Sequence, residues 1–159
     1  MATETAETAE TAEPTNFKIS LLGGNVFIPD SNKNFTGIAL EVQIRNSGQP
    51  SIAIDWKLNI IRNGQPYPAQ FAKPPPKLTL QGEKTGRIIV RRSNLQLPEL
   101  AAMKPLRLED TPIQGGILFY IRMPQADILA AETILELSVE DITGKRFFTR
   151  QKIGDWMPN

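Results

Sequence analysis

Basic side chains dominate the segment from Lys57 to Arg92, where eight of the nine ionised side chains are Lys or Arg and the ninth is Glu83. Such a cluster attracts phosphates and other anions if its members share one face. The residues predicted to bind an anion are Lys84, Arg87, Arg91 and Arg92. The alternative is a solvated strand edge that Lys and Arg protect against aggregation. Only Tyr67 and Phe71 are aromatic within this segment, so base stacking, and with it a nucleic-acid partner, is not indicated.

The usual catalytic constellations cannot be assembled, because the chain has neither histidine nor cysteine. Two pairs of adjacent acids, Glu109-Asp110 and Glu140-Asp141, are candidates for carboxylate catalysis. Neighbouring residues of a strand point to opposite faces, whereas glycoside cleavage needs two carboxyl groups about 5–10 Å apart across a cleft. No serine lies in a nucleophile elbow, and no glycine loop suits a phosphate. We therefore expect no enzyme, no catalytic residue and no cofactor.

A possible calcium loop begins at Asp30-Ser31-Asn32-Lys33-Asn34 and places Glu41 at its twelfth position. Phe35 occupies the sixth position, where glycine permits the sharp turn of such loops. A polar turn whose Asp and Asn side chains bond their own backbone fits better. The sequence therefore predicts no metal site.

Two neighbouring segments identify the fold class. Every second residue is apolar from Ile38 to Ile44 and again from Ile52 to Ile60, with Asn46-Ser47-Gly48-Gln49-Pro50 between them. This period of two is typical of strands with one buried face. The residues predicted to form the core are Leu40, Val42, Ile54, Trp56, Leu58 and Phe119.

Turn residues recur about every ten positions along the rest of the chain. Asn63-Gly64 predicts a tight hairpin, and Gly23-Gly24 predicts a bulge or bend within a first strand at 17–28. Pro98 predicts the start of a short helix that ends before Pro105, and 127–132 is at most two helical turns. Further strands are predicted at 78–80, 86–92, 115–123, 133–141 and 146–153.

Trp56, in the strand after the turn at 46–50, resembles the core tryptophan of immunoglobulin-like sandwiches. The segments 115–119, 135–141 and 144–145 resemble the closing strands of bacterial immunoglobulin-like domains without a disulfide. The resemblance covers about residues 17–153 and implies an all-β, immunoglobulin-like antiparallel β-sandwich of seven to nine strands with one or two short helical insertions. There is no cysteine pair, and Tyr120 is expected to face away from the core, so antibody-type kinship is not implied. A sandwich fold transfers no function.

Residues 1–14 carry a Glu-Thr-Ala repeat with four glutamates and are predicted to form a disordered acidic tail. Residues 15–159 are predicted to form a single β-sandwich domain. The tail lacks the features of a secretion signal, and no apolar run approaches the ~20 residues that cross a bilayer. The sequence therefore predicts a soluble, cytoplasmic protein with no membrane span.

These observations predict a non-enzymatic protein-interaction or structural module whose partner is another protein. The segment 99–141 has the opposite bias, with eight acids against three bases. The alternatives for these two segments are pairing between copies in a homo-oligomer and ordinary surface. Pro74-Pro75-Pro76, between Lys73 and Lys77, fits either a polyproline ligand or a stiff loop. Polyanion binding through 57–92 is the alternative function, and a carboxylate-based hydrolase is the least favoured.

Overall fold

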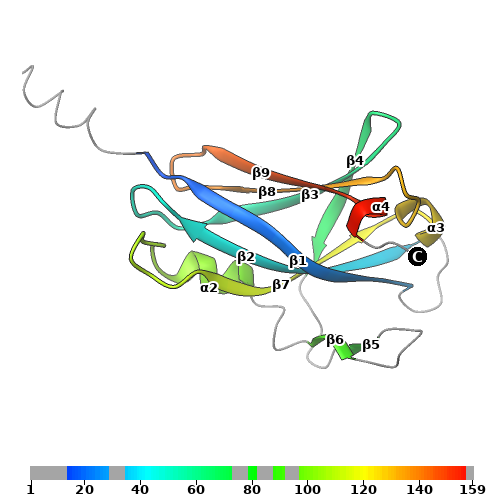
Figure 1. Ribbon diagram of the computed structural model, residues 1–159, viewed down its shortest axis with the longest axis horizontal. Coiled ribbons are helices and arrows are strands. Elements are labelled where there is room, and N and C mark those ends of the chain that lie inside the picture. Colours follow the sequence, from blue (N-terminus) through cyan, green and yellow to red (C-terminus); the bar gives the residue numbers. More distant parts are fainter. Residues whose placement is uncertain (1–13, 29–34, 73–78, 82–87, 92–96, 157–159) are drawn as a thin grey trace, which may run out of the picture.

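Strands make up most of the computed structural model, which describes residues 14–28, 35–72, 79–81, 88–91 and 97–156 (Figure 1). The strands are β1 (Phe17–Phe27), β2 (Thr36–Asn46), β3 (Ile54–Arg62), β4 (Gln65–Ala72), β5 (Thr79–Gln81), β6 (Ile88–Arg91), β7 (Ile113–Ile121), β8 (Ile134–Glu140) and β9 (Arg146–Lys152). The helices are α2 (Leu97–Met103), α3 (Gln125–Ile128) and α4 (Ile153–Trp156). The predicted acidic tail lies outside the described residues, except for Pro14.

Seven strands form one antiparallel sheet in the order β1-β2-β7-β4-β3-β8-β9, and β5 and β6 pair separately. β4 joins the strands β1-β2-β7 to the strands β3-β8-β9, since it pairs with β3 through its first residues and with β7 through Gln70–Ala72. The two edge strands approach each other, with the rings of Phe17 and Phe147 5.1 Å apart. The sheet is therefore nearly closed, like a barrel (Figure 1). The all-β class is confirmed, whereas the specific immunoglobulin-like sandwich is not, because β4 makes the sheet continuous.

The turn chemistry of the sequence fixes two local features of this sheet. Asn63 and Gly64 both have positive φ, at 52° and 78°, as the tight turn between β3 and β4 requires. The register of β1 against β2 shifts between Leu21 and Gly23, which confirms the predicted irregularity in the first strand. Both features are local, so the sequence predicts them without knowledge of the fold.

The interior of the barrel holds the apolar residues of the alternating strands. Leu40, Val42, Leu58 and Phe119 are at most 1% exposed, and Trp56 is 6% exposed. Ile54, also predicted to be core, is only half-buried. Asp55 has a positive φ of 54°, and the register of β3 against β8 shifts between Ile54 and Lys57. The alternation therefore breaks immediately before Trp56, and Ile54 does not share the buried face of β3.

Helix α2 covers one end of the barrel and agrees with the predicted helix after Pro98. Its buried residues are Leu97 and Ala101, which join the core cluster. The Ala101 carbonyl accepts a hydrogen bond from the backbone N–H of Ala53 (3.0 Å), just before β3. α3 is shorter than the predicted segment at 127–132 and begins two residues earlier. Among the described helices, none is long and apolar enough to cross a membrane.

Candidate functional site

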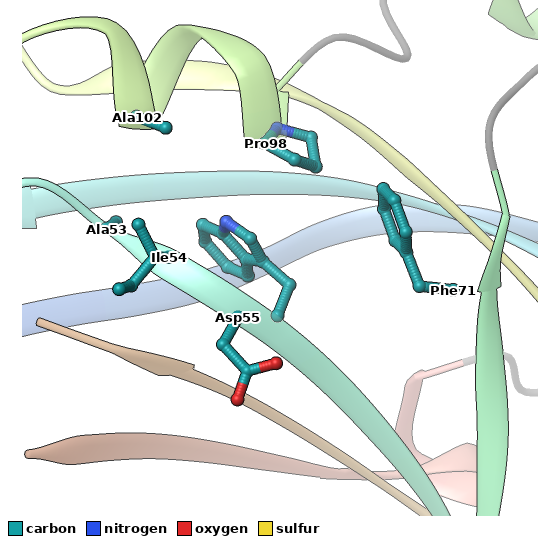
Figure 2. Close-up of a pocket in the computed structure, with 7 residues that line it drawn as sticks. Ala53, Ile54, Asp55, Phe71, Pro98 and Ala102 are labelled. Carbon is teal, nitrogen blue, oxygen red and sulfur yellow. The ribbon is translucent and has the colours of Figure 1, made fainter. Parts of the chain in front are cut away.

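A pocket of about 260 Å³ lies between α2 and the start of β3. It is lined by Ala53, Ile54, Asp55, Trp56, Phe71, Pro98 and Ala102. Figure 2 shows Pro98 and Ala102 of α2 facing Ala53 and Ile54, with Phe71 to one side. Pockets for drug-sized ligands typically measure about 300–1,000 Å³, so this one suits one or two amino-acid side chains better than a large cofactor.

The pocket exists because α2 and β3 are held together at one point and diverge from it. Ala101 is buried and bonded to Ala53, whereas Pro98 and Ala102, on the adjacent helical face, line the pocket. The chain before β3 is fixed a second time, since Ser51 and Leu106 form a pair of backbone hydrogen bonds (2.8 and 3.4 Å). The walls of the pocket are therefore anchored twice, where α2 ends and β3 begins.

The Trp56 indole supplies an unpaired polar group to this apolar pocket. Its side chain is almost fully buried, and its Nε1–H has no hydrogen-bond acceptor among the described residues. A buried tryptophan N–H usually finds a partner, and leaving such a donor unpaired costs about 1–3 kcal/mol. Because the nitrogen itself is buried from solvent, this unpaired donor lies within the wall of the pocket and not on its open surface.

Arg146 of β9 holds the irregular start of β3 in place. Its Nη1 donates hydrogen bonds to the Asp55 carbonyl (3.1 Å) and to Ser138 Oγ (2.8 Å). Its Nη2 donates to Asp55 Oδ2 (2.5 Å) and to Glu140 Oε2 (2.6 Å). Lys57 Nζ lies 3.7 Å from the same Asp55 oxygen. Two cations thus balance two carboxylates beside the pocket, and Figure 2 shows the Asp55 carboxylate directed away from α2.

Asp141, which the sequence pairs with Glu140 as a candidate catalytic acid, stabilises the turn between β8 and β9. Asp141 Oδ1 accepts hydrogen bonds from the Thr143 hydroxyl (2.6 Å) and from the backbone N–H groups of Thr143 (2.9 Å) and Lys145 (3.0 Å). Burial pushes the pKa of Asp141 upward, but these hydrogen bonds outweigh it and hold the pKa below its usual range. Glu140 is paired with Arg146, and Glu109 and Asp110 are exposed. Asp141 and Glu140 are therefore engaged in hydrogen bonds and an ion pair, and none of the four acids lines the pocket.

Glu41 is the second described residue with a buried polar atom that lacks a partner, its Oε2. Burial raises the pKa of this carboxyl, and a hydrogen bond with Gln114 lowers it only in part. The rest of the possible calcium loop, Asp30–Asn34, lies outside the described residues. Within the described part of the chain, no three acidic side chains gather into a group that could hold a metal ion.

The predicted anion site falls almost entirely where the structure gives no description. Lys84, Arg87 and Arg92 lie outside the described residues, and only the backbone of Arg91 is described, in β6. Anion binding by these residues stays a prediction. Lys73–Lys77, with its three prolines, also lies outside the described residues.

Sequence reasoning placed Trp56 in the core but did not identify it as part of a pocket. The sequence carries one relevant signal, a tryptophan, whose N–H usually finds a hydrogen-bond partner when it is buried. Pro98, Ala102 and Phe71 carry no chemical signature of a site, since each is common in ordinary helices and strands. Only the contact between α2 and β3, about 45 residues apart in the chain, brings them together.

No family model matches the chain, and no curated protein matches its sequence. Two solved structures are similar in shape. One is a proposed lipoprotein (YcdA) from Bacillus subtilis, with 11% identity and a TM-score of 0.46 over 89% of this chain. This chain spans only 38% of the length of that protein. The other is the proposed ApaA protein from Bordetella pertussis, with 12% identity and a TM-score of 0.39, covering 87% of this chain and 90% of the other. Both similarities are too weak to carry an argument.

Proposed function

We propose that this protein is a non-enzymatic interaction module that binds a partner protein through the pocket between α2 and β3. The observation that carries the proposal is the apolar lining of this pocket, in which Asp55 has the only ionisable side chain and Phe71 is 48% exposed. A partner that inserts an apolar group buries these walls.

The surroundings of the pocket support contact with a protein. Phe71 lines the pocket and is 48% exposed. Aromatic residues are enriched in the centres of protein interfaces, where they act as anchors. A partner seated on the pocket therefore has the exposed part of the Phe71 ring to cover beyond the pocket itself.

The lining residues offer little to a reaction. Asp55 is the only one with an ionisable side chain, and its carboxylate is bound by Arg146 and directed away from α2. A general base must lie within hydrogen-bond reach of the proton that it removes, and this one does not face the pocket. Binding without catalysis is therefore the better account of this site.

A displayed library of random peptides, selected on the full-length protein, tests the proposal. Ala102 is exposed on α2 and lines the pocket, so Ala102→Phe fills the pocket without disturbing the core. We expect selected peptides to bind the wild-type protein and to lose at least tenfold in affinity for Ala102→Phe. The matched control is Ala126→Phe, an exposed alanine of α3 at the other end of the barrel (Figure 1).

Peptides that bind wild type and Ala102→Phe equally well, or a selection that yields no binder, would overturn the proposal.

Four expectations from the sequence are not part of this proposal and stay predictions. They are the immunoglobulin-like kinship, the single domain at 15–159, a cytoplasmic location, and polyanion binding as an alternative function.

A further inference from the structure

We infer that the acidic N-terminal segment, residues 1–13, binds the surface of its own barrel beside the point at which it joins the fold. This surface consists of four exposed side chains, Lys18, Arg45, Lys104 and Arg107, and is called the basic end. None of the four lines the pocket between α2 and β3. The contact therefore adds to the proposed function and does not depend on it.

The chain joins the barrel at a fixed point beside these basic residues. The Pro14 carbonyl accepts a hydrogen bond from the backbone N–H of Gln49 (3.2 Å). The backbone N–H of Asn16 donates to Asn46 Oδ1 (3.1 Å). Figure 1 shows the start of β1, the end of β2 and the chain that follows α2 at the same end of the barrel. Residues 1–13 are therefore tethered at this end.

The buried Asn46 side chain brings the basic residues into one surface. Asn46 is 3% exposed, and its Nδ2 donates a hydrogen bond to the Leu106 carbonyl (2.8 Å). Arg45 and Arg107 are the chain neighbours of these two bonded residues, so they lie close together. Lys18 of β1 is directly opposite Arg45 of β2. Residues far apart in the sequence thus contribute positive charge to one place.

The charges of the basic end are not balanced within the described part of the chain. Like charges directly opposite on neighbouring strands repel each other, as Lys18 and Arg45 do. No ion pair or hydrogen bond engages the side chains of the basic end among the described residues. Every other Lys or Arg whose side chain the structure describes has an ion pair or lies over an aromatic ring: Lys57, Arg62, Arg122, Lys145, Arg146, Arg150 and Lys152.

The nearest exposed acids, Glu109 and Asp110, follow Arg107 in the chain and are fewer than the bases of the basic end. An excess of positive charge therefore remains there. The segment 1–13 carries the opposite charge, since it has four glutamates and no Lys or Arg. Charge complementarity at the tether selects this segment as the occupant.

The length of the segment allows the contact. An extended chain spans about 3.3–3.6 Å per residue, so residues 1–13 reach about 40 Å from Pro14. Exposed ion pairs are individually weak, but a tethered segment is present at a high effective concentration, which favours binding to its own chain. The bound segment also keeps other polyanions away from the basic end.

A paramagnetic label on the segment tests the inference by nuclear magnetic resonance. The full-length chain has no cysteine, so Ala9→Cys provides one attachment point for a nitroxide, which broadens the signals of nearby nuclei. The amide signals of Arg45 and Arg107 are followed in the ¹⁵N-labelled protein. The matched control carries the same label and has glutamine in place of all four glutamates of residues 1–13, which keeps the tether and removes the charge.

At about 0.01 M salt, we expect the broadening at Arg45 and Arg107 to be about twofold stronger with the glutamate segment than with the glutamine segment. At about 1 M salt, where the Debye length is about 3 Å, the two should be equal. Arg45→Gln combined with Arg107→Gln should also remove the difference. Arg62→Gln combined with Lys152→Gln removes the same charge from ion-paired positions and should not.

Equal broadening by the glutamate and glutamine segments at low salt would overturn the inference. A mixture of spin-labelled chains without ¹⁵N and ¹⁵N-labelled chains without the spin label reports contacts between copies. If the mixture shows the same broadening as the doubly labelled chain, the segment binds another molecule, and the inference is again wrong. Neither outcome involves Ala102 or the pocket, so the proposed function is tested separately.

Discussion

The turn between β8 and β9 and the pocket between α2 and β3 each contain one deeply buried polar side chain, and they treat it in opposite ways. Asp141 is 2% exposed, and its Oδ1 accepts three hydrogen bonds. Trp56 is 6% exposed, and its N–H has no acceptor in the described part of the chain. Burial is therefore nearly equal, and only the completeness of hydrogen bonding separates the two. The hydrogen-bonded Asp141 carboxylate stabilises the fold, whereas the unpaired Trp56 N–H lowers the stability of the fold.

Ser51 contacts both regions, so a difference in how firmly they are attached to the fold does not explain their difference in hydrogen bonding. Ser51 Oγ accepts a hydrogen bond from the backbone N–H of Ile142 (3.0 Å), next to Asp141. The backbone of Ser51 also pairs with Leu106, beyond the end of α2. The turn and the pocket are thus tied to the same residue, and the pocket remains open within a well-connected end of the barrel.

The largest expected effect comes from Trp56. Trp56→Ala should lower the free energy of unfolding by about 3–5 kcal/mol, because it removes a buried aromatic side chain. Trp56→Phe keeps most of the apolar contact and removes the unpaired donor, so it should cost far less. Urea denaturation of both variants measures the difference. A loss below about 1 kcal/mol for Trp56→Ala would show that Trp56 does not support the core.

Asp141→Ala should come next, with a loss of about 1.5–3 kcal/mol, because three donors lose a charged acceptor. The folded pKa of Asp141 is lowered, so this stabilisation is complete above the unfolded pKa of about 3.9 and disappears as the pH falls through the folded pKa. The gap between wild type and Asp141→Ala should therefore be widest near pH 7 and narrow below about pH 4. Thermal unfolding across this range checks the sign. The exposed Asp110, changed to Ala, is the control and should show no such dependence.

Arg146→Met tests whether the irregular start of β3 keeps the pocket in shape. The variant removes all four hydrogen bonds to Asp55, Ser138 and Glu140, and about 1–2 kcal/mol should be lost because the ion pairs are partly exposed. The indole N–H signal of Trp56 in a nuclear magnetic resonance spectrum should move, because the backbone at Asp55 loses its contact with Arg146. Lys152→Met, which breaks a pair with the exposed Glu132, should cost less than about 1 kcal/mol and leave that signal unchanged.

The smallest effect has the opposite sign and concerns Glu41. Because burial raises its folded pKa, Glu41 stabilises the fold least when it is ionised, and stability should rise as the pH falls through that pKa. Glu41→Gln should therefore raise the melting temperature at pH 7 by about 1–3 °C and flatten the pH dependence. An unchanged or lower melting temperature would mean that the unpaired Glu41 Oε2 does not destabilise the fold.

The sequence could predict features that depend on neighbouring residues alone. The alternation around Leu40 and Leu58, the Asn63-Gly64 turn and the helix after Pro98 all belong to this class. The position of Ile54 could not be predicted, because it depends on the positive φ of Asp55. That conformation is held by Arg146, 91 residues later in the chain. No window of local sequence contains both partners.

The candidate site could not be predicted for the same reason. The alternation of its strand predicts that Trp56 is in the core, and the ring is indeed buried. The alternation says nothing about a hydrogen-bond partner for the indole N–H. The closure of the sheet was also out of reach, because alternation shows that a strand has a buried face but not which strands are its neighbours. The difference between a two-sheet sandwich and one nearly closed sheet depends on the pairing of β4 with two strands.

That double pairing of β4 has a consequence for the order in which the protein folds. Its first residues meet β3 across a two-residue turn, whereas Gln70–Ala72 meet Leu118–Tyr120, about fifty residues later in the chain. The hairpin can form early, but β1-β2-β7 and β3-β8-β9 join through β4 only after that long loop has closed. Such distant pairings slow folding. The amide hydrogens that Gln70–Ala72 share with β7 would report by hydrogen exchange how often the two halves part.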